Sequence, residues 1–241
     1  MSSLGLLIAA VFLTSALSGA IGMGGGVTLL GVMANLLPPP AVVPIHGVIQ
    51  LTGNTTRTLN LWKKIAWRPV VLYVPSLVLT AFLAVRLYSG SEMAWLRPAI
   101  GVFILGFLLW DRFRPRRLAL PMWVFAPGGL IGGVLTVLVG ATGPYLAAFF
   151  LRDDMDREQV IATKAAIQSF GHLIKIPAFL SIGFDYGVHL GLLLPLIAGA
   201  IAGTLFGTWV LGRTGERLFR VLFRVILGAL AVRLIAMYLI S

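Results

Sequence analysis

The chain has 241 residues, of which 59% are hydrophobic and 11% are charged, and its mean hydropathy is +0.97. Soluble domains carry about 25% charged residues, so this composition excludes an ordinary soluble domain and indicates an integral membrane protein. The net charge is +11, but the basic residues gather in short clusters between apolar runs, as in the cytoplasmic loops of membrane proteins, and we expect no nucleic-acid partner. Because the chain has no cysteine, it has no disulfide, thiolate metal site or cysteine nucleophile.

Eight apolar segments follow one another along the chain. They cover residues 4–36, 42–61, 69–90, 94–111, 122–151, 158–182, 187–212 and 217–240. No basic residue precedes the first segment, so we expect a membrane segment there rather than a cleaved signal peptide. A spanning helix needs about 20 residues, which most of the segments match. Segments 4–36 and 122–151 are too long for one simple span.

Each long segment contains a glycine-rich break near its middle, GAIGMGGG at residues 19–26 and GATGP at residues 140–144. Irregular backbone at membrane depth is tolerated only inside protein or beside a water-filled cavity. A new helix is expected after each break, from about Gly26 and Pro144, and the N–H groups and positive dipole end of a helix start favour an anion. The breaks therefore predict a substrate site. The alternative is close helix packing through small residues.

Two further segments, 42–61 and 158–182, each carry four polar residues at i, i+4, i+8 and i+11, a spacing that places them on one helix face. The two sets are His46, Gln50, Asn54 and Arg57, and Lys164, Gln168, His172 and Lys175. Ionisable groups are costly in hydrocarbon, so two matched sets predict an internal pathway for a polar substrate. Since most of the ionisable members are cationic, we expect that substrate to be an anion.

The two polar sets are separated by a constant offset of 118 residues, and the same offset relates Gly22 to Gly140 and Gly25 to Gly143. One ungapped offset thus connects both breaks and both polar helices. The chain is therefore predicted to be a duplicated four-segment unit, with a first membrane repeat at residues 1–118 and a second at 119–241.

The basic residues in the loops discriminate between two topologies. If all eight segments crossed the membrane, these residues would divide almost equally, seven against eight, between the two sides. If segments 4–36 and 122–151 are re-entrant hairpins, thirteen basic residues face the cytoplasm and only Arg86 and Arg97 face outward. The positive-inside rule favours the second arrangement, in which each half has three crossings and the halves have opposite orientations. The alternative for each long segment is a tilted or kinked single span.

In this inverted arrangement Arg57 lies toward the cytoplasm and Lys175 toward the outside, so cations would line both approaches to the site. The alternative is that both side chains snorkel to the membrane interface. Gln50 and Gln168 lie near the middle of their helices and offer amide donors and acceptors. Their alternative role is interhelical hydrogen bonding.

The other polar positions leave more than one interpretation open. His46 and His172 are either proton carriers or structural histidines. Lys164 lies near the inner end of its helix, where it would join the cations that line the approach, and the alternative is that its side chain is solvated beside the nearby loop. The acidic run Asp153, Asp154, Asp156 and Glu158 precedes the second polar helix. We expect it to cap that helix, and the alternative is a gate at the cytoplasmic entrance.

With the SGAIGMGGG sequence at residues 18–26, the polar helix that follows it and the GATGP echo at residues 140–144, the chain resembles the TauE/SafE sulfite exporter family, also called TSUP. The pattern of two four-segment halves extends this resemblance over essentially the whole chain. It implies a secondary transporter of the plasma membrane that moves sulfur-containing anions, often outward, such as sulfite, thiosulfate, sulfoacetate and other sulfonates. Thr142 and Pro144 stand where the first half has glycines, so the two half-sites are chemically unequal.

We therefore expect an all-α polytopic protein of the plasma (inner) membrane, built from two inverted four-segment repeats, each a re-entrant hairpin plus three transmembrane helices. Its function would be alternating-access export of a sulfur-containing anion, with no cofactor or metal. The residues expected to contact the anion are Gly22, Gly24, Gly25, Gly26, Gln50, Asn54, Arg57, Gly140, Thr142, Gly143, Pro144, Gln168, His172 and Lys175. An anion channel is the alternative function, whereas no nucleophile–base pair or metal cluster indicates an enzyme. The substrate, coupling ion and oligomeric state stay open.

Overall fold

The computed structural model describes residues 3–22, 24–88, 96–113, 120–152 and 154–210, together with residues 232, 235 and 236. Within these ranges every regular element is a helix, which confirms the all-α prediction for the described part of the chain. Apart from those three residues, the predicted segment 217–240 lies outside the described residues, as does Asp153.

The elements follow the predicted segments closely. They are α1 (Ser3–Ile21), α2 (Gly25–Leu36), α3 (Pro39–Asn60), η1 (Trp62–Lys64), α4 (Trp67–Tyr88), α5 (Leu96–Phe113), η2 (Met122–Val124), α6 (Phe125–Leu138), α7 (Gly143–Ala148), α8 (Arg157–Leu180), η3 (Gly187–His189) and α9 (Leu190–Val210). Local chemistry explains the two long polar helices. α3 begins with proline at its first positions, where the missing N–H costs nothing. α8 begins with a capping box at Asp156 and Gln159.

The first long segment folds back on itself. α1 ends at Ile21 and α2 begins at Gly25, and between them Gly22 and Gly24 have φ values of 79° and 93°. These left-handed values favour glycine. Gly25 lies so close to the carbonyl oxygen of Thr14 that a Cβ atom would clash with it. Because Thr14 lies about two turns before the end of α1, α2 must start by returning along α1.

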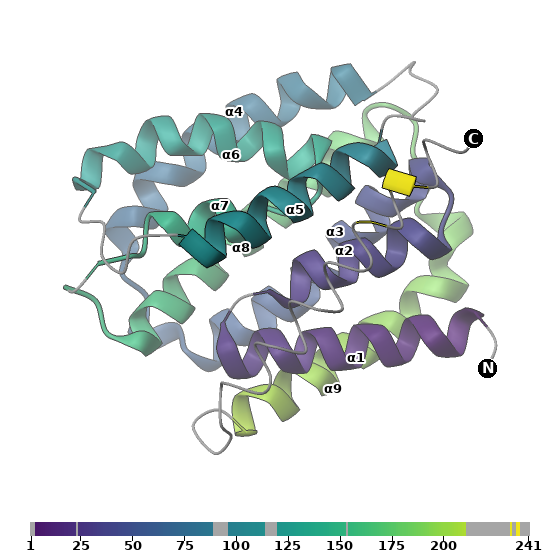
Figure 1. The fold of residues 1–241 in the computed structure, drawn as a ribbon, viewed down its shortest axis with the longest axis horizontal. Helices are drawn as coiled ribbons and strands as arrows, with labels where there is room; N and C mark the ends of the chain where they lie inside the picture. The colour runs from purple at the N-terminus through teal and green to yellow at the C-terminus, as the bar shows by residue number, and fades with distance from the viewer. Residues whose placement is uncertain are drawn as a thin grey trace.

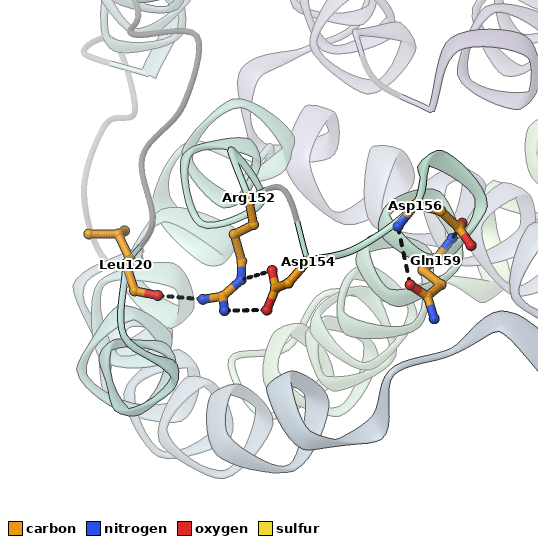
Figure 2. A network of polar contacts seen from close by, with 5 residues as sticks. All are labelled: Leu120, Arg152, Asp154, Asp156 and Gln159. Atoms are coloured by element: carbon orange, nitrogen blue, oxygen red, sulfur yellow. Dashed lines mark hydrogen bonds and ion pairs between the residues drawn. The ribbon is translucent and has the colours of Figure 1, made fainter.

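The second long segment also reverses direction. Gly140, with a φ of 91°, follows α6, and α7 begins at Gly143. The hydroxyl of Tyr145 then donates to the carbonyl oxygen of Gly128 at 3.1 Å, back near the start of α6. The Arg152 guanidinium reaches the carbonyl oxygen of Leu120, so both ends of the segment meet (Figure 2). Neither long segment is a kinked single helix, although the second arm was predicted longer than the six residues of α7.

Each hairpin packs its first arm on a helix from the other half of the chain. α1 lies along α9, and α6 lies along α4 (Figure 1). Close contact is possible because glycines face main chain at both interfaces, as is common between membrane helices. Gly203 of α9 lies against the carbonyl oxygen of Phe12, and Gly133 of α6 lies against that of Leu77.

The polar helices α3 and α8 pack against each other at the centre of the molecule. Three contacts show that they are antiparallel, since the residue number rises on one helix as it falls on the other. The stem of Lys175 packs on Gly47. The hydroxyls of Thr58 and Ser169 lie 3.2 Å apart. Beyond the end of α3, Lys64 forms an ion pair with Glu158 at 3.0 Å.

Among the residues that the structure describes, two helices are long and apolar enough to cross a membrane by length and composition, at Trp67–Leu87 and Gly187–Trp209. At 1.5 Å per residue, α3 and α8 are about 33 and 36 Å long, which also matches a bilayer core of about 30 Å. Their mean hydropathy is lower because each carries the polar face that points into the protein. The outer surface instead exposes large apolar side chains such as Leu83 and Trp209.

Candidate functional site

A cavity of about 20 Å³ lies between the two glycine breaks and the polar faces of α3 and α8. Its lining consists of Ser18, Gly22, Gly24, Gly26, Val27, His46, Gln50, Asn54, Arg57, Ala141, Gly143, Gln168 and His172. A volume of this size holds about one or two water molecules. The structure therefore brings segments from both halves of the chain around one small, polar space.

Most of the predicted contact residues whose side chains the structure describes lie in this lining, and four do not. The four are Gly25, Gly140, Thr142 and Lys175. Gly25 packs on α1 behind the first break, and Thr142 is buried with 5% of its surface exposed. Pro144 lies in the first turn of α7. Ser18, Val27, His46 and Ala141 line the cavity but were not among the expected contacts, although His46 belongs to the first polar set, Ala141 to the second break, and Ser18 directly precedes the first break.

The glutamine amides lie beside the helix starts that follow the breaks. A Cβ atom on Gly26 would lie 3.1 Å from Oε1 of Gln50. In the second half, a Cβ atom on Gly143 would lie 3.2 Å from Nε2 of Gln168. Glycine at both positions thus leaves room for an amide, and the amides place adaptable donors and acceptors at the cavity wall.

His46 and His172 form a pair that contributes to the same wall. Their ring centroids are 5.9 Å apart and the rings meet edge to face at 75°. Nε2 of His46 lies 2.9 Å from the carbonyl oxygen of Gly26, to which a protonated nitrogen would donate. Nδ1 has no hydrogen-bond partner in either ring within the described structure, although both side chains are buried. These nitrogens are available to a ligand or to water.

Arg57 is buried at the end of a polar relay along α3. Only 3% of its surface is exposed, so the alternative of snorkelling to the interface is wrong in this structure. Its guanidinium lies 3.4 Å from Oδ1 of Asn54, whose amide donates to the carbonyl oxygen of Gln50 at 2.8 Å. Nε of Arg57 has no partner among the described residues. The relay holds a cationic group at the cavity wall with donors to spare.

The two lysines of α8 contact the breaks themselves. Nζ of Lys175 donates to the carbonyl oxygen of Gly140 at 2.7 Å, and Nζ of Lys164 lies 3.4 Å from that of Gly22. Their exposed fractions are 0% and 4%. The alternative of a solvated Lys164 is wrong, because α8 turns its side chain inward. Lys175 is likewise buried within the protein.

The charge of this interior is unbalanced. Within the described part of the chain, neither Arg57 nor Lys175 forms an ion pair. A buried charge is unfavourable unless it is paired, and leaving one partner out is costly. The surroundings of the cavity are thus suited to an anion, and the chemistry of the lining (guanidinium, amides, imidazoles and main-chain N–H groups) matches the acceptor oxygens of such a ligand.

The acidic run has structural partners outside the cavity. The Asp156 carboxylate accepts from the Gln159 N–H at 2.8 Å, and Gln159 Oε1 accepts from the Asp156 N–H (Figure 2), which confirms the predicted cap. Two charge-assisted hydrogen bonds from Arg152 hold the pKa of the Asp154 carboxyl below its usual value. The Glu158 carboxylate raises the pKa of Lys64. The described carboxylates of this run lie at the surface, and none of them forms an ion pair with Arg57 or Lys175.

In the described ranges, no group of three His, Asp or Glu side chains is placed to hold a metal ion. A family model with the description sulfite exporter TauE/SafE matches residues 7–234, which includes both hairpins and both polar helices. No curated protein matches the chain. No solved structure matches it either.

Proposed function

The chain belongs to the sulfite exporter TauE/SafE family, a family of transporters rather than enzymes, and we propose that it moves sulfur-containing anions out across the plasma membrane by alternating access. The proposed substrates are sulfite, thiosulfate, sulfoacetate and other organosulfonates. The observation that carries this proposal is the cavity between the two breaks, with Arg57 in its wall and Lys175 behind it, both buried and neither ion-paired among the described residues.

Two membrane repeats, residues 1–118 and 119–241, support alternating access. The offset of 118 relates α1 to α6, α3 to α8 and α4 to α9. Under this relation the contact of α1 with α9 is equivalent to that of α6 with α4, and the contact of α3 with α9 is equivalent to that of α8 with α4. The antiparallel packing of α3 and α8 fits halves of opposite orientation, which is the arrangement used in rocking transporters.

We assign the anion contacts chiefly to α2, α3 and α8. The start of α2 supplies main-chain N–H groups at Gly24 and Gly26, and Arg57 supplies charge-assisted hydrogen bonds. Gln50 and Gln168 complete the ligand shell from opposite sides. α7 contributes less than predicted because a six-residue helix has a weak dipole.

The small size of the cavity supports the proposed alternating-access cycle. An oxyanion is larger than the one or two water molecules that about 20 Å³ can hold. The lining must therefore separate to admit the substrate. We assign this closed arrangement to an occluded state, between inward-open and outward-open conformations.

Sulfite uptake into proteoliposomes tests the proposal. Replacing both amides, in Gln50→Ala/Gln168→Ala, should reduce the initial rate at least tenfold because each hydrogen bond to a charged ligand contributes about 1.5–3 kcal/mol. Asn60→Ala is the matched control, since Asn60 is an exposed amide at the end of α3. Equal rates in the wild type and the double variant would show that the site is assigned wrongly. Counterflow of unlabelled sulfite should occur in the wild type, whereas a sustained single-channel current would indicate a channel.

A further inference from the structure

Both hairpin breaks are held by the same helix. Lys164 and Lys175 lie eleven residues apart on α8, which places them about 16 Å apart along its axis. Each contacts the carbonyl oxygen of the first glycine after a hairpin's first arm, Gly22 or Gly140. We propose that the Lys164–Gly22 and Lys175–Gly140 contacts are two latches that close opposite ends of the cavity, and that one latch opens at a time. This inference rests on the proposed transport function.

At the Lys164 latch, the first break lies directly on α8. Gly22 has a φ of 79° and approaches so closely that a Cβ atom would lie 2.5 Å from the side chain of Ile161. Gly22 also lines the cavity. When the ammonium of Lys164 binds its carbonyl oxygen, the break is drawn onto α8 and covers the cavity at this end. Separation of these groups would uncover Gly22 and the space behind it.

At the Lys175 latch, the second break lies on the opposite hairpin and on α3. A Cβ atom on Gly140 would lie 3.2 Å from the side chain of Leu30 and 3.3 Å from that of Val43, so hydrophobic contact supports this latch. The stem of Lys175 crosses Gly47 of α3 to reach the Gly140 carbonyl oxygen. The wall next to it contains Ala141 and His46. This end is therefore closed by the second break.

The two latches lie at opposite ends because α3 and α8 are antiparallel. Lys175 lies level with Gly47 near the start of α3. Lys164 lies toward the other end, where Ala66 N donates to the hydroxyl of Thr163 at 2.9 Å. In the proposed topology the loop after α3 is cytoplasmic, so Lys164 closes the cytoplasmic end and Lys175 the outer end.

The two contacts differ in length. At 2.7 Å the Lys175 contact is a normal charge-assisted hydrogen bond, whereas the Lys164 contact at 3.4 Å is long and therefore weaker. Each lysine lies behind the lining rather than in it, so its removal leaves the cavity wall in place.

Thiol labelling can test each latch separately because the chain has no cysteine. Ser18→Cys introduces one thiol into the cavity wall. A small, charged, membrane-impermeant methanethiosulfonate is then added to intact cells or to inside-out vesicles, without substrate. Lys164→Met should raise the labelling rate from the cytoplasmic side at least fivefold, and Lys175→Met should do so from the outside. Lys63→Met, which removes an exposed lysine, should change neither rate.

The outcomes separate this inference from the function on which it rests. The latches would be overturned if the labelling rates from the two sides were equal in all variants. They would also be overturned if each lysine variant raised the labelling rate from both sides, even with sulfite transport intact. A rise on the opposite sides would support two latches but reverse the proposed orientation. Lys164→Arg and Lys175→Arg keep the cation and should retain slow labelling. If Lys175→Met fails to fold, the one-sided effect of Lys164→Met still decides the proposal.

Discussion

The Arg152 guanidinium donates a hydrogen bond to the carbonyl oxygen of Leu120, 32 residues earlier in the chain, and binds both oxygens of Asp154 (Figure 2). Leu120 precedes α6 and Arg152 follows α7, so one side chain joins the entrance and exit of the second hairpin. A segment that crossed a bilayer would have these ends about 30 Å apart. The geometry thus supports re-entry, and it gives Arg152 a structural role that its exposed partner Asp154 reinforces.

The Arg152–Asp154 pair gives a pH-dependent contribution to stability. Hydrogen bonds from Arg152 lower the pKa of Asp154 below 3.8. A carboxyl whose pKa is lower in the folded state stabilises the fold above its unfolded pKa, and this contribution is lost as the pH falls through the folded value. Asp154→Asn should lower the melting temperature in detergent at pH 7 by at most a few degrees, since an exposed pair contributes about 1 kcal/mol or less.

The difference between Asp154→Asn and wild type should stay constant from pH 7 to about 5 and be lost below pH 3.8, as the pH falls through the lower pKa that Asp154 has in the folded protein. Asp185→Asn is the control, because the Asp185 carboxylate accepts from the Gly187 N–H and not from a guanidinium. A difference that grew as the pH fell would contradict the assigned sign.

We predict that Gly140 has a role in transport in addition to allowing the backbone turn. A larger residue there should therefore slow transport more than its effect on stability explains. Its φ of 91° disfavours a side chain by about 1–2 kcal/mol, and an added Cβ would also press on Leu30 and Val43 at the cavity end. Gly183 has a similar φ of 88° but open space around it. Gly140→Ala and Gly183→Ala should therefore lose comparable stability, whereas only Gly140→Ala should slow sulfite uptake severalfold. Similar uptake in the two variants would show that the second break has no special role.

The positions of the breaks and polar helices could be predicted from the sequence because they depend on local patterns. Glycine tolerates the left-handed turn at Gly22 and Gly140, and spacing at i, i+4 and i+8 fixes which residues share a helix face. The helices after the breaks begin at Gly25 and Gly143, within one residue of expectation. The length of α7 could not be predicted, because the Arg152 contacts, and not local helix propensity, determine the path of the chain after Ala148.

The partners of the buried lysines could not be predicted for a different reason. Lys164 contacts Gly22 across 142 residues and Lys175 contacts Gly140 across 35. No spacing rule relates such positions, since they meet only after α8 packs between the hairpins. The pattern identified both lysines as polar-face residues but not their partners. The interpretation that Lys164 is solvated was therefore wrong.

The inverted topology predicts which exposed positions can be labelled from outside. Val188, 74% exposed in the connection between α8 and α9, should react with an impermeant maleimide on intact cells as Val188→Cys. Lys63→Cys and Asp154→Cys should react only in inside-out vesicles, because η1 and the end of the second hairpin are expected in the cytoplasm. Ready labelling of an active Asp154→Cys variant from outside would place the exit of the second hairpin on the wrong side for re-entry.

Arg57 should affect anion affinity and stability in opposite directions. Its guanidinium is buried without an ion pair among the described side chains, so replacing it by a neutral side chain removes an unfavourable buried charge. Arg57→Gln should therefore keep or raise the melting temperature of the empty protein. It should also raise the apparent KM for sulfite by about 10- to 100-fold, because a hydrogen bond from a charged donor contributes about 1.5–3 kcal/mol.

Arg68→Gln provides the matched control for this variant, since Arg68 is exposed at the start of α4 and does not line the cavity. Its KM should match that of the wild type. Sulfite should stabilise the wild type against heat, because a ligand that binds only the folded state adds to its stability, and this stabilisation should be much smaller in Arg57→Gln. An unchanged KM together with a lower melting temperature in Arg57→Gln would instead assign the guanidinium to packing, and the anion would have to be bound elsewhere.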